Sequence, residues 1–294
     1  MNKGKFTEKS WKYGPAADIP ATATRMWNPA MIKIRNGGQL FSATVNGNAT
    51  PEQYCTQAAV QTNDFIWVEM QHSPGTWHDV ANMWAAAHAP NGSCAATAHA
   101  VPGVRIANEN EMDEQHATDM GALVLVIPTV RTVDEAQKSA NWAFFPPLGH
   151  RSAGAGAAPG YWNAKAGGAY RQTINDNLVL ILMIETLDGL ENADRIAKVK
   201  GVTGLFAASS DLGNFTGFRQ GDPDYERAIN IVHDATLKAH IHLCGPSSWA
   251  DRPDFDCFQG GPPGATPPGG RGRGGRGRGG PPGANPAAAP APAQ

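Results

Sequence analysis

Short, uninterrupted apolar segments recur along this chain, and segments with helical spacing separate most of them. The segments ALVLVI at 122–127 and LVLILMI at 178–184 contain no polar residue. Strands that are apolar on both faces are typical of a parallel sheet whose faces are covered by other elements. Eight strands are predicted, at 40–45, 65–70, 103–107, 122–127, 177–184, 204–208, 241–244 and 255–258.

The number of strands predicts a closed architecture. Eight strand–helix units over about 250 residues are typical of an α/β protein of the (β/α)8 barrel type. Helices are predicted at 51–62, 77–88, 111–120, 133–142, 187–199 and 222–239, with Thr50 as an N-cap and Gly121 as a C-cap. No helical pattern follows the last strand, so the eighth helix is predicted to be missing.

Composition divides the chain into three parts. Residues 1–28 are predicted to be an irregular arm, 29–260 the barrel and 261–294 a disordered tail rich in Gly and Pro. The tail contains four arginines and no acidic residue, which leaves 20 basic and 26 acidic residues in the rest of the chain. This acidic balance argues against a nucleic-acid-binding body. The segment RGRGGRGRGG resembles RNA-binding RGG segments, but without aromatic residues it favours weak contact with anions.

The sequence also limits where the chain resides. It has no apolar run of about 18 residues, which argues against a membrane span, and no apolar signal segment at its start. A cytoplasmic location is predicted, with an exported form left open. The four cysteines lack zinc-site spacing and are predicted to be buried thiols; a Cys244–Cys257 bridge is the alternative.

Polar residues follow several of the predicted strands at the point where each strand ends. Glu69 and His72 follow the second strand, and Arg105 ends the third. Glu185 and Asp211 follow the fifth and sixth strands, so their carboxylates can converge at one rim of a barrel, where function gathers. Two carboxylates with water form a hard oxygen site for Mg²⁺ or Mn²⁺. The alternative is that these residues cap the following helices.

Five segments give the chain a family resemblance that covers roughly residues 28 to 260. These are DFIWVEMQHSP (64–74), VPGVRIANENEMDEQHATDMGALVLVIPTV (101–130), FFPPLGHRSAG (144–154), LILMIET (180–186) and GVTGLFAASSDLG (201–213). In this order they resemble the HpcH/HpaI aldolase family of metal-dependent class II pyruvate aldolases. The resemblance implies a (β/α)8 barrel of the phosphoenolpyruvate/pyruvate type and a homo-oligomer.

The resemblance implies a metal site and a carboxylate site at the ends of the fifth and sixth strands. Glu185 and Asp211 match the two metal ligands, for Mg²⁺ or Mn²⁺ and with Co²⁺ possible. Ser210 and Asp211 stand where backbone N–H groups of the family bind the carboxylate of the 2-oxo acid.

The resemblance also implies three catalytic side chains. Arg105 matches the arginine that holds the substrate carbonyl oxygen, His72 the histidine tied to the catalytic base, and Asp119 the aspartate that partners this histidine. The implied reaction cleaves a 4-hydroxy-2-oxo acid to pyruvate and an aldehyde through a metal-stabilised enolate. No lysine stands at a predicted strand end, which agrees with a mechanism that forms no Schiff base.

Some positions depart from the family pattern and leave alternatives open. Gln71 replaces the usual glutamate before His72, and Met183 stands where relatives often have glutamine. The substrate is therefore not predicted beyond its class. A lyase of the citrate-lyase-β or malyl-CoA type and a non-enzymatic barrel with an RNA-binding tail remain alternative interpretations. Tyr161 and Trp162, in a long Gly- and Ala-rich segment at 145–171, are candidates for lining a substrate entrance.

Overall fold

A closed barrel of eight parallel strands forms the centre of the molecule. The computed structural model describes residues 19–154, 156–207 and 210–265. The strands pair in chain order, and β8 closes the barrel by pairing with β1. Their bounds are β1 (Leu40–Asn46), β2 (Phe65–Glu69), β3 (Val101–Arg105), β4 (Val124–Ile127), β5 (Val179–Ile184), β6 (Gly204–Ala207), β7 (His242–Pro246) and β8 (Phe255–Gln259). The predicted fold class is confirmed.

Helices surround the barrel, and local sequence signals explain where several of them begin and end. They are α1 (Pro29–Arg35), α2 (Pro51–Ala58), α3 (Trp77–His88), α4 (Glu111–Met120), α5 (Val133–Ala143), α6 (Ala158–Trp162), α7 (Tyr170–Thr173), α8 (Leu187–Ile196), α9 (Ser210–Thr216) and α10 (Pro223–Ala239). Thr50 caps α2 through a capping box, and Gly121 ends α4 with φ of 115°. Among the described residues, no helix has the length and apolarity needed to cross a membrane.

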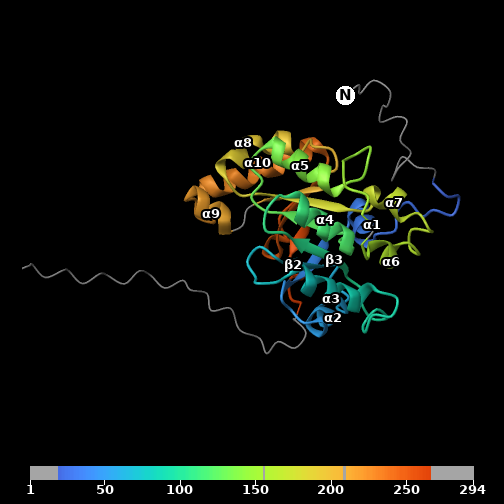
Figure 1. Cartoon of the computed structure of the whole chain (residues 1–294). Helices are drawn as coiled ribbons and strands as arrows, with labels where there is room; N and C mark the ends of the chain where they lie inside the picture. The colour runs from blue at the N-terminus through green and yellow to red at the C-terminus, as the bar shows by residue number, and fades with distance from the viewer. Residues whose placement is uncertain (1–18, 155, 208–209, 266–294) are drawn as a thin grey trace, which may run out of the picture.

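The amino-terminal end of the barrel is closed by elements that the sequence did not predict. Figure 1 shows α1, α6 and α7 gathered at one end of the barrel, with α9 at the other. Trp27 and Asn28 are buried at this end, and both donate their backbone N–H to the Asn177 side chain. Trp162 stacks on Trp27 with 6.0 Å between ring centroids. The last residues of the predicted arm are therefore part of the packed body.

The connection between β7 and β8 is unusually short. A single 3-10 turn, Ser247–Trp249, joins β7 to β8, where a barrel of this type normally has a helix. After β8, the described residues continue only to residue 265 and contain no further helix. The predicted disordered tail lies largely outside the residues that the structure describes.

Strand alternation separates an inner core from an outer one. On β5, Val179, Ile181 and Met183 belong to the cluster inside the barrel, whereas Leu180 and Leu182 pack against the helices. Side chains two residues apart lie on the same face of a strand. Charged residues that are in phase with the inner cluster and stand at the carboxyl end of a strand therefore lie at the mouth of the barrel.

The cysteines differ from the prediction. Cys55 and Cys94 form a disulfide with 6.0 Å between their Cα atoms, which joins α2 to the segment after α3. Cys244 and Cys257 are paired in register on β7 and β8, and both are free and buried. The alternative Cys244–Cys257 bridge was wrong, and free thiols were correctly predicted for this pair only. The spacing of the cysteines in the sequence does not indicate the Cys55–Cys94 bond, because the tertiary fold brings these two residues together.

Removing the disulfide is expected to destabilise the barrel. The bond spans 39 residues, so its loss should lower the free energy of unfolding by about 3–4 kcal/mol. The double variant Cys55→Ser/Cys94→Ser tests this by urea denaturation. A reducing agent should destabilise the wild type to the same extent and leave the variant unchanged; equal stability of the oxidised wild type and the variant would contradict the expectation.

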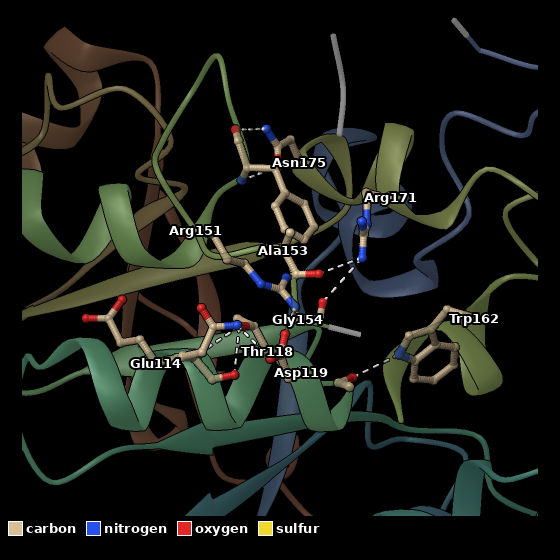
Figure 2. A network of polar contacts seen from close by, with 12 residues as sticks. Glu114, Thr118, Asp119, Arg151, Ala153, Gly154, Trp162, Arg171 and Asn175 are labelled. Atoms are coloured by element: carbon tan, nitrogen blue, oxygen red, sulfur yellow. Dashed lines mark hydrogen bonds and ion pairs between the residues drawn. The ribbon is translucent and has the colours of Figure 1, made fainter. Parts of the chain in front are cut away.

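A carboxyl group is buried between the helices that cover the barrel. Glu114 of α4 is fully buried, and within the described part of the chain neither of its side-chain oxygens has a hydrogen-bond partner. Figure 2 shows it on the same helix as Asp119. Burial raises the pKa of Glu114 well above its usual value; the nearby Ser139 hydroxyl offsets this only in part, and the charges of Glu109 and Asp113 add to it.

Glu114 should make stability fall as pH rises. Because the folded-state pKa lies above the unfolded value of 4.5, the folded chain keeps a proton that the unfolded chain releases. Its stabilising contribution is complete below pH 4.5 and is lost as pH rises toward the folded-state pKa, by up to about 1.4 kcal/mol per pH unit. Glu114→Gln should flatten this slope in urea denaturation, and the exposed Glu111→Gln on the same helix should not. Parallel slopes for wild type and Glu114→Gln would contradict this.

Candidate active site at the carboxyl end of the barrel

Three charged side chains lie inside the mouth of the barrel, at the carboxyl ends of β2, β3 and β5. Glu69, Arg105 and Glu185 are 6%, 8% and 1% exposed, respectively. Glu69 is in phase with Trp67, and Glu185 with Met183, so each lies one layer above the apolar interior. Burying charge costs several kcal/mol unless it is paired or hydrogen-bonded, so each of these groups must have partners.

Glu69 and Arg105 form a buried ion pair between neighbouring strands. The two residues face each other in the β2–β3 register. Arg105 approaches Glu69 Oε2 with Nε at 2.8 Å and Nη2 at 2.5 Å. The indole N–H of Trp67 donates to the same oxygen at 3.4 Å, and the guanidinium carbon lies 5.7 Å from the centroid of that ring. These contacts fix the guanidinium over the inner core.

The other carboxylate oxygen of Glu69 shapes the loop that carries the predicted base. Glu69 Oε1 accepts the backbone N–H groups of Gln71 at 2.8 Å and His72 at 3.0 Å. The His72 side chain is exposed at this rim, and its imidazole has no hydrogen-bond partner among the described residues. Glu69 therefore links Arg105 and His72. From the sequence, Glu69 was recognised only as a polar residue at the end of a strand. Its position two residues after Trp67, on the same face of the strand, was the signal that it holds other site residues in place.

Glu185 is held by a residue that the sequence did not single out. Its Oε2 accepts the backbone N–H of Thr129 at 3.0 Å and the Thr129 hydroxyl at 3.2 Å. Thr129 has φ of 51°, a left-handed conformation that is uncommon for threonine. Thr186, not Glu185, caps α8 by accepting the N–H of Gly189 at 3.1 Å. The capping alternative for Glu185 is therefore wrong.

Ser210 and Asp211 lie in the first turn of α9, after β6. Ser210 is exposed and Asp211 is half-buried. The strands that precede Glu185 and Asp211 are neighbours, with Ile184 opposite Ala207. Both carboxylates therefore follow adjacent strands at the same rim.

The donor set fits a hard divalent cation. Within the described part of the chain, no three His, Cys, Asp or Glu side chains cluster in a way that could hold a metal ion. Mg²⁺ is commonly bound through one or two carboxylates, with water and substrate oxygens completing its coordination. Glu185 and Asp211 match that pattern of ligands, whereas a closed structural site would need more protein groups.

Asp119 does not lie beside His72 in this chain. Asp119 is in the last turn of α4, five residues before β4 begins, so it lies toward the amino-terminal rim of the barrel. His72 follows the carboxyl end of β2, at the opposite rim. Asp119 Oδ1 pairs with Arg151 Nη2 at 2.7 Å (Figure 2). Gln115 donates to Asp119 Oδ2 at 2.6 Å. The expected contact between Asp119 and His72 is therefore not made within one chain.

The long segment at 145–171 also lies at the amino-terminal end. Trp162 is 2% exposed and donates its indole N–H to the Gly121 carbonyl at 2.9 Å (Figure 2). Arg151, with a side chain that is 1% exposed, lies 4.5 Å from the centroid of the Phe145 ring. The prediction that Tyr161 and Trp162 line an entrance to the site in their own barrel was wrong.

Comparisons with known proteins agree with this architecture. The family model described as HpcH/HpaI aldolase/citrate lyase matches residues 46–244. A 2-keto-3-deoxy-L-rhamnonate aldolase from Klebsiella pneumoniae is 31% identical over 175 residues, which cover 58% of this chain and 62% of that protein. Its counterpart from Escherichia coli O157:H7 is 30% identical over 205 residues, 69% of this chain and 72% of that protein.

Two solved structures show the same fold. An HpcH/HpaI aldolase/citrate lyase family protein from Burkholderia cenocepacia has a TM-score of 0.67 at 24% identity, covering 80% of this chain and 93% of that one. An HpcH/HpaI aldolase from Desulfitobacterium hafniense has a TM-score of 0.65 at 22% identity, covering 78% of this chain and 89% of that one.

Proposed function

Since this chain belongs to the HpcH/HpaI aldolase/citrate lyase family, we propose that it is a divalent-metal-dependent aldolase that cleaves a 4-hydroxy-2-oxo acid to pyruvate and an aldehyde. The observation that carries the proposal is the buried Arg105–Glu69 pair at the same rim as Glu185. The names of the curated relatives support an aldolase over the CoA-dependent lyase alternative.

Arg105 is the group that binds the 2-oxo oxygen in this proposal. Glu69 engages Nε and Nη2, while among the described residues the recorded partner of Nη1 is the thioether sulfur of Met183 at 3.9 Å. Sulfur is a weak acceptor, so a carbonyl oxygen would be a better partner for this N–H group. Cleavage of the C3–C4 bond places negative charge on the 2-oxo oxygen, where a fixed guanidinium stabilises it.

Glu185 and Asp211 would hold the cation, with Mg²⁺ or Mn²⁺ preferred and Co²⁺ as a further candidate. When bound, the cation supplies Lewis-acid stabilisation of the enolate charge. The Thr129 contacts keep Glu185 Oε2 oriented in the mouth. Ser210 and Asp211, at the start of α9, are proposed to receive the substrate carboxylate through their backbone N–H groups.

His72 is proposed to accept the proton of the 4-hydroxyl group, directly or through water. Its exposed imidazole stands at the rim, and its backbone is fixed by Glu69. The neutral imidazole of a histidine can accept a proton in general base catalysis. After cleavage, the proton is available for the enolate carbon, which becomes the methyl group of pyruvate.

An Asp119–His72 pair would have to form between two copies of the chain. The two residues occupy opposite rims of one barrel, and Asp119 is already oriented by Arg151. A homo-oligomer is therefore part of the proposal. Mixing inactive His72→Ala and Asp119→Ala chains after reversible dissociation is expected to restore about a quarter of the activity, because some sites then receive both native residues. No recovery despite reassembly into mixed oligomers would count against a shared site.

The disulfide bears on the cellular location of the chain. Stable disulfides are typical of oxidising compartments, so Cys55–Cys94 favours an exported form over the cytoplasmic prediction. Alkylation of the chain in acid-quenched native cells, followed by mass spectrometry, should find these two cysteines protected. Free Cys55 and Cys94 would support the cytoplasm.

The test of function is release of pyruvate from a panel of 4-hydroxy-2-oxo acids. Activity is expected with Mg²⁺, Mn²⁺ or Co²⁺ and should be lost with EDTA and recovered when metal is restored. Exchange of the pyruvate methyl protons with deuterated water provides a second readout that needs no aldehyde. Absence of both activities with every metal would overturn the proposal.

A further inference from the structure

We propose that the segment after α5 positions Asp119 for the reaction in a second copy of the chain, with Arg151 fixing the carboxylate by charge and Gly154 fixing it by close contact. This inference rests on the proposed aldolase function, in which Asp119 pairs with His72 of the partner subunit. It adds the groups that hold Asp119 in place. Arg151 and Gly154 touch neither substrate nor metal in this proposal, so they are positioning residues.

Arg151 is the charged contact that holds Asp119. Its Nη2 lies 2.7 Å from Asp119 Oδ1, and its side chain is 1% exposed, whereas that of Asp119 is 19% exposed. The guanidinium packs on the Phe145 ring, with 4.5 Å to the centroid. A planar guanidinium that stacks on a ring and bonds to a carboxylate has a defined orientation. Asp119 is therefore fixed by a buried cation while part of its side chain stays accessible to a partner.

The backbone at Gly154 is a second constraint on Asp119. A Cβ at residue 154 would lie 2.3 Å from Asp119 Oδ2, so only a glycine lets the chain pass this close to the carboxylate. The carbonyl oxygens of Ala153 and Gly154 accept Nη2 of Arg171 at 2.8 and 3.4 Å, as Figure 2 shows. Arg171 therefore holds this segment in contact with Asp119.

The Asp119 carboxylate keeps room for a further donor. A carboxylate offers about four acceptor positions. In the described part of the chain, its recorded side-chain donors are Arg151 on Oδ1 and Gln115 on Oδ2. The N–H group of an imidazole can be a third donor. A carboxylate that accepts from one ring nitrogen fixes the tautomer in which the other nitrogen can accept a proton.

Anchoring of the segment alone does not explain this arrangement. A buried ion pair adds little stability over neutral groups of similar shape. Moreover, Arg151 Nε is buried without a hydrogen-bond partner among the residues that the structure describes. A requirement for an ionised carboxylate in one orientation does explain why a charged group is buried here. Because Asp119 and His72 lie at opposite rims of one barrel, the effect of Arg151 must appear in a neighbouring copy.

Arg151→Met and Gly154→Ala should each lower kcat for pyruvate release by about 10- to 100-fold with little change in KM, because the substrate contacts remain. The Cβ added at residue 154 meets the end of a side chain, which can move, so Gly154→Ala should fold and displace the carboxylate. Arg151→Lys keeps a cation for Asp119 and should restore most of the activity. Gly160→Ala, where a Cβ meets no atom within 4 Å, is the matched control and should behave as the wild type.

A double-mutant cycle separates positioning from a general loss of structure. In an Asp119→Asn background, Arg151→Met and Gly154→Ala should lower kcat no further, because both act through the Asp119 carboxylate. Losses that multiply in the double variants would show that Arg151 and Gly154 act independently of Asp119, and would overturn the inference.

Mixing of variants identifies the copy on which Arg151 acts. After reversible dissociation, equal amounts of Arg151→Met and His72→Ala chains should regain about a quarter of the wild-type activity, because some sites then combine a native His72 with a native Arg151–Asp119 pair from the other copy. If Arg151 acted within its own barrel, the mixture would stay at or below the residual activity of Arg151→Met, and the inference would be wrong. Absence of pyruvate release and of methyl-proton exchange in the wild type would instead refute the aldolase function itself.

Discussion

Glu185→Gln is expected to lower metal-dependent pyruvate release by roughly 1,000-fold, and Asp211→Asn by a similar factor. A glutamine side chain at position 185 keeps an oxygen that can accept the Thr129 N–H, so the buried position stays hydrogen-bonded and the fold should persist. What is lost is the negative charge that would hold the cation.

The measurement pairs turnover at saturating metal with direct binding of Mn²⁺ by calorimetry. Both variants should bind Mn²⁺ far more weakly than the wild type while retaining its thermal stability. Glu191→Gln, which removes an exposed carboxylate from α8, is the matched control and should behave as the wild type in both assays. Full turnover of either site variant with saturating metal would remove Glu185 or Asp211 from the metal site.

The barrel could be predicted from the sequence because each strand is recognisable from its own residues. Strands buried on both faces must be apolar throughout, and such runs are visible without knowledge of their partners. The helix ends at Thr50 and Gly121 could also be predicted from local sequence, since these residues interact with backbone groups only a few positions away. Helix α1 was missed although Asn28 caps it and Pro29 begins it; the docking of Trp27 and Asn28 on distant Asn177 could not be seen in the sequence.

The candidate site was predictable only in part, because its organisation depends on register and not on sequence distance. Strand ends identified Arg105 and Glu185, but the pairing of Glu69 with Arg105 follows from the alignment of β2 with β3. Thr129 gave no signal in the sequence, since its role arises from a left-handed backbone next to β5. The sequence also could not show that Asp119 faces Arg151 at the far rim.

Arg105→Met is expected to impair stability and catalysis together. It leaves Glu69 charged and 6% exposed without its cation, which should lower the free energy of unfolding by about 3–5 kcal/mol. It also removes the donor proposed for the 2-oxo oxygen, which should lower kcat/KM by about 100- to 1,000-fold. Arg105→Lys should also lower both stability and kcat/KM, because an ammonium group cannot reproduce the planar arrangement in which Arg105 engages Glu69 and keeps Nη1 for the substrate.

A double variant separates the two effects of Arg105. In Arg105→Met/Glu69→Gln the unpaired charge is gone, while residue 69 can still accept the N–H groups of Gln71 and His72. Urea denaturation should therefore show recovery of most of the lost stability, since a buried ion pair can be replaced by neutral groups at little cost. Pyruvate release should stay low, because the substrate-binding donor is still missing. If the double variant regained turnover along with stability, Arg105 would be a structural residue and the proposed enolate stabilisation would have to come from elsewhere in the mouth.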